Sequence, residues 1–300
     1  MKKKFFKHAL LLLLSVILPC TIISCNSFSS TEYAIVSENN VSSDGFVYDK
    51  YENSTVKITG MESLPSVLRI PETIDGMTVV EIADEAFADN EKLFYVEFPN
   101  NEIKLGKRVF GGSVALLTVN FSGAVNAIPA NTFEGCTNLV AIENADSVIE
   151  IASQAFADCS SLSRFTIPSR LEKLGAEAFR GCSSLASVVI PESVTEIGES
   201  VFWGCTALVS AEIHGETVIP SYSFLNCTAL TRVLIGDKVT AIGEESFRGC
   251  RVLYSVEIGS GITEIADYAF HACDELTDVK LPSKNNIKIG EGNESLGIQG

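Results

Sequence analysis

The sequence predicts a repeat solenoid, in which coils of about 23 residues stack and pair their strands into a parallel β-sheet. Phenylalanine recurs every 23 residues, and once after 22, at Phe87, Phe110, Phe133, Phe156, Phe179, Phe202, Phe224, Phe247 and Phe270. A leucine follows six residues after each of them, at Leu93, Leu116, Leu139, Leu162, Leu185, Leu208, Leu230, Leu253 and Leu276. A further apolar residue lies five residues beyond most of these leucines, and Asn144 breaks this pattern in one unit. One such unit cannot bury its own apolar positions, whereas stacked units bury them against one another.

The idealised unit AFxGCxxLxxVxIPxxVxxIGxx contains three local elements. The LxxVxI stretch alternates and is rich in β-branched residues, which predicts a strand that pairs in parallel with the next coil. The VxxI stretch predicts a second, shorter strand or an extended turn. The AFxGC stretch has room for one helical or 3₁₀ turn. We expect Gly175, Gly198 and Gly243 to occupy turns with positive φ. In the 22-residue unit, Pro220 replaces this glycine and predicts a local kink or bulge.

This unit resembles the leucine-rich repeat of the BspA-like type. The resemblance rests on AFRGCSSLASVVIPESVTEIGESVF and its copies over about residues 87–281, and on an entry region that runs from FVYDKYENSTVKITG to VVEIADEAF. It implies a parallel sheet with short turns or one-turn helices on the other side. It also implies a surface protein whose partners are host proteins, extracellular matrix or other bacteria, and the resemblance does not say which.

The N-terminal residues have the layout of a secretory signal. A basic region with four lysines precedes an apolar stretch from Ala9 to Leu18, which is too short to span a membrane. The segment ends in Ile-Ile-Ser-Cys, which resembles a bacterial lipobox with Cys25 as the lipidated residue. Cys20, preceded by Pro19, is the rival acceptor, and an ordinary signal peptide with an incidental cysteine is the alternative.

These features predict five segments. Residues 1–24 form a lipoprotein signal peptide, and residues 25–45, rich in Ser and Asn, form a flexible tether. An N-terminal cap with the first coil follows at 46–82, where the sequence IDGM reads as a small insertion. The leucine-rich repeats span 83–281, and a C-terminal cap spans 282–300.

The charge balance disfavours nucleic acid and anionic membranes as partners. The full chain carries 22 basic and 38 acidic residues, a net charge of −16. Removal of residues 1–24 removes four lysines and no acids, which leaves 18 basic residues and a net charge of −20. A surface of this sign repels polyanions.

Seven cysteines recur at one position of the repeat, three residues after the phenylalanine: Cys136, Cys159, Cys182, Cys205, Cys227, Cys250 and Cys273. Equivalent residues of stacked coils lie about 4.8 Å apart with parallel Cα–Cβ vectors, which suits neither a disulfide nor four zinc ligands that converge on one point. An odd number cannot pair completely. The column therefore predicts a structural ladder of small buried groups, extended by Asn90 and Ser113. Disulfide formation, and less so metal binding or catalysis, stay open as alternatives.

The sequence offers no constellation of catalytic residues. It has no GxGxxG, GK[ST], GxSxG, HExxH or DxDxDG motif, and its carboxylates are scattered. We therefore expect no enzymatic activity, no cofactor and no metal.

Function is instead expected on the strand residues that flank the core valine, because these point away from the core. Aromatic and charged types among them are the candidate ligand-binding residues: Tyr95, Arg164, Glu212, Arg232 and Glu257.

The leading hypothesis is a non-catalytic lipoprotein of the bacterial cell envelope, anchored in the outer membrane and exposed at the surface, that recognises or adheres to proteins. A periplasm-facing scaffold for envelope proteins is the first alternative, because residues 26–32 lack an acidic cluster. A glycan-active enzyme is a weaker alternative, since no pair of carboxylates stands out.

Overall fold

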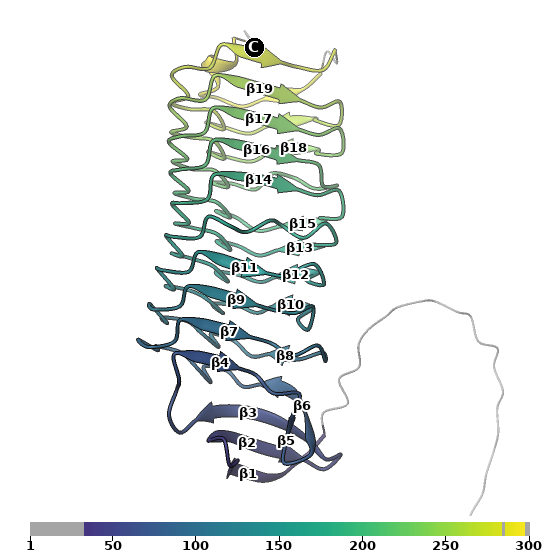
Figure 1. The fold of residues 1–300 in the computed structure, drawn as a ribbon. Coiled ribbons are helices and arrows are strands. Elements are labelled where there is room, and N and C mark those ends of the chain that lie inside the picture. Colours follow the sequence, from purple (N-terminus) through teal and green to yellow (C-terminus); the bar gives the residue numbers. More distant parts are fainter. Residues whose placement is uncertain (1–32, 284–285, 298–300) are drawn as a thin grey trace, which may run out of the picture. The chain divides into compact units, whose positions relative to one another are not determined.

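The computed structural model describes residues 33–283 and 286–297. The predicted signal peptide, with Cys20 and Cys25, lies outside these residues. The described chain winds as a stack of coils whose strands follow one another in chain order (Figure 1). In this part of the chain, no helix combines the length and the apolar character needed to cross a bilayer.

The structure corrects the predicted tether for the residues next to the first coil. β1 (Ile35–Val41) pairs antiparallel with β2 (Phe46–Tyr51), and β2 pairs antiparallel with β3 (Thr55–Met61). The tether prediction is therefore wrong for residues 35–41, whereas residues 25–32 are outside the described chain. No residue of β1 is buried, so backbone pairing holds the strand, and the composition carries no apolar signal for it.

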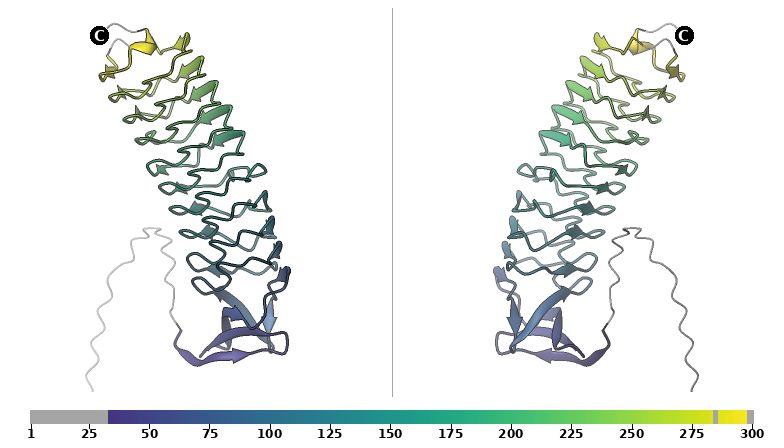
Figure 2. Two further views of the ribbon diagram at one scale, coloured as in Figure 1. Left: turned by 90° about the vertical axis from the view of Figure 1, so that its left-hand side faces the viewer. Right: turned by 90° about the vertical axis from the view of Figure 1, so that its right-hand side faces the viewer.

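The antiparallel strands pass into the coil stack through β6 (Met77–Ile82), which pairs in parallel with β3 (Figure 2). β5 (Thr73–Ile74) and β6 form a hairpin closed by Asp75 and Gly76, whose φ values are 50° and 77°. An Asp-Gly pair suits such a tight turn, because both residues adopt positive φ. The IDGM insertion is thus the turn of this hairpin.

The LxxVxI stretches form the wide sheet, as predicted. Its strands pair in parallel in two groups and are β4 (Val67–Arg69), β7 (Tyr95–Glu97), β9 (Thr118–Asn120) and β11 (Ala141–Glu143), then β14 (Ser187–Ile190), β16 (Ser210–Ile213), β17 (Arg232–Ile235), β19 (Ser255–Ile258) and β21 (Asp278–Lys280). The register advances by one repeat unit between paired strands, for example from Val188 to Ala211.

The VxxI stretches form a narrow sheet of two-residue strands, also as predicted. After β6 these are β8 (Lys104–Leu105), then β10 (Ala127–Ile128), β12 (Glu150–Ile151), β13 (Lys173–Leu174) and β15 (Glu196–Ile197), then β18 (Ala241–Ile242), β20 (Glu264–Ile265) and β22 (Lys288–Ile289).

Two prolines interrupt the narrow sheet. In other coils the residue after the second strand donates its N–H to the previous coil, as Gly198 does to the Leu174 carbonyl oxygen at 2.7 Å. Pro129 and Pro220 occupy this position and lack the donor. The paired strands break before β10 and after β15, and the coil of Pro220 keeps an isolated bridge from Ile219 to Ile242. The kink expected at Pro220 is therefore a missing rung of the narrow sheet.

The core is a continuous column of stacked phenylalanine rings. The nine repeat phenylalanines, from Phe87 to Phe270, are at most 1% exposed. Neighbouring ring centroids lie 5.0 to 5.7 Å apart, and their planes differ by 20° or less. Leucine, valine and isoleucine columns surround the rings, so each coil buries its apolar positions on the next.

The AFxGC stretches are successive turns, and the single-turn helix allowed for them does not form. The N–H of Gly111 bonds to the Arg108 carbonyl, and the N–H of Ser113 bonds to the Phe110 carbonyl. Residues two before and two after each phenylalanine have positive φ, such as Asn131 at 60° and Gly135 at 71°. The helix found in the described chain is the 3₁₀ turn η1 (Glu294–Leu296) near the C-terminal end.

The expectation that Gly175, Gly198 and Gly243 have positive φ is wrong. These glycines do not have positive φ. A Cβ at Gly198 would instead overlap the backbone of Ala176 in the previous coil, and one at Gly175 would overlap Ser153. Glycine is present because two backbones approach closely, a constraint that the sequence pattern does not separate from turn geometry.

Candidate functional site

The outer face of the wide sheet carries two rows of side chains. Paired strands align Ser187, Ser210, Arg232, Ser255 and Asp278 in one row, and Val189, Glu212, Leu234, Glu257 and Lys280 in the other. The residues between the rows, such as Val188 and Val233, are buried. Most row residues are exposed or half-buried, although Ala141 and Ser255 are buried at 2% and 9% exposure.

The five predicted ligand-binding residues fall into three places on this face. Glu212, Arg232 and Glu257 lie on the neighbouring strands β16, β17 and β19. Tyr95 lies in β7, in the other group of strands. Arg164 lies in the coil between the two groups, outside any strand.

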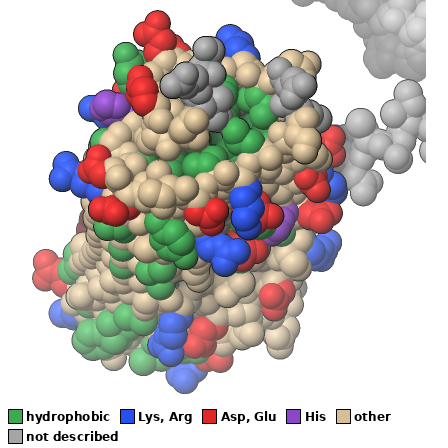
Figure 3. Space-filling model, turned by 90° about the horizontal axis from the view of Figure 1, so that it is seen from above, with side chains coloured by type: hydrophobic (Ala, Val, Ile, Leu, Met, Phe, Trp, Pro, Cys, Tyr) green, Lys and Arg blue, Asp and Glu red, His purple; other side chains and the backbone are tan. Residues whose placement is uncertain are grey.

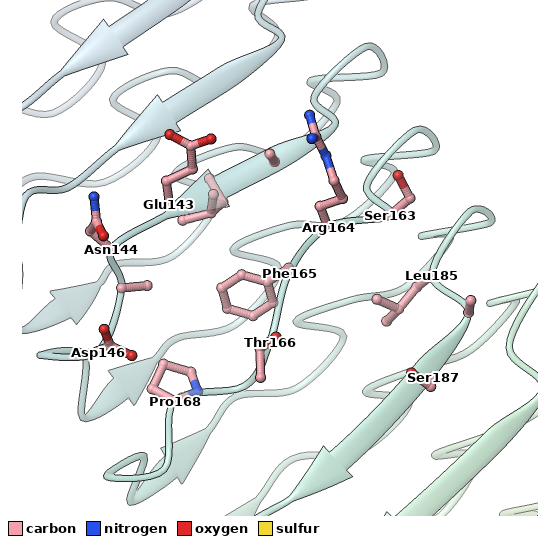
Figure 4. Close-up of a pocket in the computed structure, with 14 residues that line it drawn as sticks. Glu143, Asn144, Asp146, Ser163, Arg164, Phe165, Thr166, Pro168, Leu185 and Ser187 are labelled. Carbon is pink, nitrogen blue, oxygen red and sulfur yellow. The ribbon is translucent and has the colours of Figure 1, made fainter.

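The wide sheet is interrupted at this coil of Arg164. The first group of strands ends with β11, the second begins with β14, and the coil between them keeps an isolated bridge from Ala141 to Arg164. The N–H of Arg164 bonds to the Val140 carbonyl oxygen at 3.0 Å. On the other side, no described backbone hydrogen bond joins residues 163–167 to residues 185–190. Figure 4 shows the coil of Arg164 and Phe165 between the two strands.

Two sequence departures cause the interruption. Asn144 occupies the position where the preceding coil buries Phe121, but Asn144 is exposed and has a φ of 57°. A polar side chain at this position turns outward, although β11 ends at the same repeat position as β7 and β9. In the next coil, Phe165 stands where neighbours have Ile142 and Val188.

The ring of Phe165 packs between the core rings of two coils. It lies 5.3 Å from the Phe156 ring and 5.5 Å from the Phe179 ring, measured between centroids, and stays half-buried. Residues 163–167 keep the register of β11 at the bridge from Ala141 to Arg164 and form no bridge to β14.

A cavity of about 560 Å³ occupies the interruption. Glu143, Asn144 and Asp146 line it from the β11 side, and Arg164, Phe165, Thr166 and Pro168 line it from the intervening coil, as Figure 4 shows. Ala186 and Ser187 close the β14 side. A second cavity of about 90 Å³ lies between Thr166 and Val189 and reaches the core rings of Phe179 and Phe202. The larger volume is within the range of ligand-binding pockets, about 300 to 1,000 Å³.

The charges at this site are uneven. About half of the described basic side chains form ion pairs, as in Arg180 with Asp158 at 2.9 Å and Lys280 with Glu257 at 3.2 Å. Viewed from above in Figure 3, carboxylates and basic side chains lie intermixed on the sides of the stack. No described carboxylate forms an ion pair with Arg164 or Arg232. Both are exposed and stand in the same row, three coils apart. Two guanidinium groups on this face are therefore available to an outside carboxylate.

The other charged candidates already have neighbours. Glu257 accepts a hydrogen bond from the Lys280 ammonium, and Glu212 Oε2 lies 3.3 Å from His214 Nε2. Tyr95 is half-buried beside Thr118 of the next strand. Of the five residues, Arg164 alone lines the cavity.

The seven repeat cysteines are buried and unpaired, in one column. Each thiol donates a hydrogen bond to the phenylalanine carbonyl of the previous coil, with Sγ to O distances of 3.0 to 3.3 Å. Ser113 Oγ makes the same bond to Phe87 at 3.1 Å, and Ser295 Oγ makes it to Phe270 at 3.0 Å. Asn90 instead accepts from the N–H groups of Lys92 and Leu93.

Burial suppresses the acidity of these thiols. It raises the pKa of Cys136, Cys205 and Cys273 to about 12 and that of the other four well above the usual range. A thiol with so high a pKa contains almost no thiolate at neutral pH, and thiolate is the nucleophile and metal ligand. Among the described residues, no cluster of three or more His, Cys, Asp and Glu side chains has an arrangement that could hold a metal ion.

The stacked coils and their two parallel sheets define a repeat solenoid. A family model described as a BspA type leucine-rich repeat region, in six copies, matches residues 80–209 and 217–293. The chain therefore belongs to the BspA-type leucine-rich repeat family, whose repeats typically mediate protein–protein interactions.

Solved bacterial leucine-rich repeat proteins resemble the chain. That of Treponema pallidum is 27% identical, with a TM-score of 0.49, over 80% of this chain and 91% of its own. A leucine-rich cell surface protein from Faecalibacterium prausnitzii A2-165 is 21% identical, with a TM-score of 0.49, over 84% and 95%. One from Bacteroides ovatus is 23% identical, with a TM-score of 0.39, over 84% and 92%. No curated protein matches the chain.

Sequence reasoning missed the cavity although its signal was present. Asn144 was visible as a break in the apolar pattern, but the break was not connected with Phe165 in the next coil. Glu143, Asp146 and Thr166 line the cavity because of this interruption, and the sequence pattern does not distinguish them from equivalent residues of other coils.

Proposed function

We propose that this chain is a non-catalytic lipoprotein of the bacterial cell envelope that recognises or adheres to proteins through the wide sheet. The carrying observation is that Arg164 and Arg232 are exposed in one row and have no acidic partner in the described chain, although acids outnumber bases. Unpaired guanidinium groups on a rigid sheet are effective anchors for a partner surface.

The envelope location is inferred from the N-terminal sequence. A lipid on Cys25 would tether the coil stack to a membrane. Replacement of Cys25 by serine should move the protein from the membrane fraction to the soluble fraction. Retention of Cys25→Ser in the membrane, with Cys20→Ser released, would assign the lipid to Cys20.

Outward exposure and adhesion are part of the same proposal. Protease treatment of intact cells should degrade the mature protein, whereas a protected protein would favour the periplasm-facing scaffold. That alternative is supported by residues 26–32, which contain a single acidic residue.

A pull-down with residues 26–300 against host and bacterial surface extracts tests recognition. Arg164→Glu with Arg232→Glu should remove the captured proteins. The matched control is Lys107→Glu with Arg251→Glu, which makes the same charge change at exposed residues outside the two rows. Equal capture by both double variants would contradict recognition through the sheet.

A further inference from the structure

We propose that the interruption of the wide sheet receives an extended, acidic segment of a partner protein, which adds as a strand to the open edge of β14 and places a carboxylate against Arg164. This inference rests on the proposed function and deepens it, because it specifies the chemistry and the backbone conformation of the partner.

The open edge is the first support. In the regular part of the sheet, alternate residues of each strand bond to the previous coil, as Asn120 does when its carbonyl oxygen accepts from the Phe98 N–H at 2.9 Å. Ser187 and Val189 are the residues of β14 that face the previous coil, and no described bond joins them to residues 163–167. An unpaired strand edge is a template for another extended chain.

The geometry of the opening is the second support. The larger cavity extends from β11 past residues 163–168 to β14, and the smaller one lies between residues 165–167 and β14; they share Phe165, Thr166, Leu185 and Ser187 in their walls. The Ser187 and Val189 side chains are exposed, so an approaching chain meets no cover. The inner wall of the smaller cavity is apolar, with Phe179 and Phe202, and suits a small apolar side chain. Alternate residues of a strand point to opposite faces, so an added strand can place one side chain inward while its neighbours face solvent.

The charged side chains around the cavity favour an acidic partner segment. Arg164 lines the larger cavity from the intervening coil and forms no ion pair with a described carboxylate. Arg232 stands three coils further along the same row. On the opposite lip, Glu143 and Asp146 repel a carboxylate. An acidic segment is therefore favoured beside β14 and disfavoured beside β11.

A peptide array tests this mode of binding without knowledge of the natural partner. The probes are seven-residue peptides of alternating valine and threonine with aspartate, lysine or asparagine at one position. The protein of residues 26–300, applied to the array, should bind the aspartate set at least tenfold more tightly than the lysine set. Arg164→Gln should remove this preference.

The backbone contribution is tested at Val189. Val189→Pro removes the N–H that faces the opening, whereas Val189→Ala removes the side chain and keeps that N–H. Proline at a strand edge leaves the bonds of β14 to β16 in place, because those bonds use the alternate residues. Binding of the aspartate peptides should fall at least tenfold in Val189→Pro relative to Val189→Ala.

The inference is overturned by any of the following results. Equal binding by Val189→Pro and Val189→Ala excludes strand addition. Absence of binding by every peptide, or binding without preference for aspartate, excludes an acidic extended segment. If the pull-down still depends on Arg164 and Arg232 in that event, recognition by the sheet stands and the strand mode alone is rejected.

Discussion

Asn144 donates a hydrogen bond from its side-chain Nδ2 to Oδ1 of Asn120 in the previous coil, at 2.8 Å. This contact holds the Asn144 side chain on the surface, at a repeat position where neighbouring coils bury an apolar residue. The interruption of the sheet begins at this residue.

Restoring the repeat at this site should stabilise the protein. Asn144→Ile with Ala145→Pro and Phe165→Val gives this coil and the next the consensus sequence. Burial of one isoleucine should raise the free energy of unfolding by about 2 kcal/mol. Urea denaturation measures this change, with Asn138→Ile at an exposed turn as the control. A less stable triple variant would show that the interruption has another cause.

The thiol column should tolerate serine better than alanine. Cys205 donates to the Phe179 carbonyl oxygen at 3.2 Å, and Ser113 and Ser295 make the same bond in other coils. Cys205→Ser keeps a donor, whereas Cys205→Ala leaves the carbonyl with one bond fewer. We expect the alanine variant to be less stable than the serine variant by about 1 kcal/mol in urea denaturation. Equal stability would mean that the column fills space without a useful bond.

Alkaline pH should destabilise the fold through the same thiols. A thiol in the unfolded chain titrates near pH 9, and Cys205 in the fold titrates near pH 12. The folded pKa is raised, so the stability contributed by the neutral thiol is complete below pH 9 and is lost as the pH rises toward 12. At pH 10, ionisation of one thiol in the unfolded state lowers the free energy of unfolding by about 1.4 kcal/mol.

Urea denaturation at pH 8 and pH 10 measures this loss. Cys205→Ser should lose about 1.4 kcal/mol less than the parent protein between these pH values. Ellman titration of residues 26–300 should find no reactive thiol in the folded state and seven in the unfolded, unreduced state. Fewer than seven would indicate disulfides and would contradict the ladder.

Substitution of two glycines should change the stability of the fold to different extents. Gly198→Ala places a Cβ against the backbone of Ala176, so it should lower the free energy of unfolding by more than about 1 kcal/mol. Gly204 has a φ of 74° and open space around its Cα, and its position holds Asn226 in the next coil. Gly204→Asn should therefore change stability by less than about 0.5 kcal/mol. Thermal denaturation of both variants separates the two constraints, and a tolerated Gly198→Ala would contradict the close approach.

The repeat makes most of this fold predictable. Phenylalanine, leucine and β-branched positions at a constant interval specify the coil length, both parallel sheets and the buried column, because each coil must match its neighbour. Strand β1 was not predictable in this way, since its residues are exposed and it is held by backbone bonds. The site was predictable only in part. Arg164 was identified from its row, but the cavity arises from Asn144 and Phe165 acting across two coils, and a pattern read one coil at a time does not contain that relationship.

The central claim is that the wide sheet is open between residues 163–167 and β14. Amide hydrogen exchange of the free protein tests it directly, because an amide without a hydrogen bond exchanges quickly. The amides of Ser187 and Val189 should exchange at least a hundredfold faster than the amide of Glu212, which lies in the paired part of the sheet. Equal protection of Val189 and Glu212 would show that the sheet is continuous and would contradict the account.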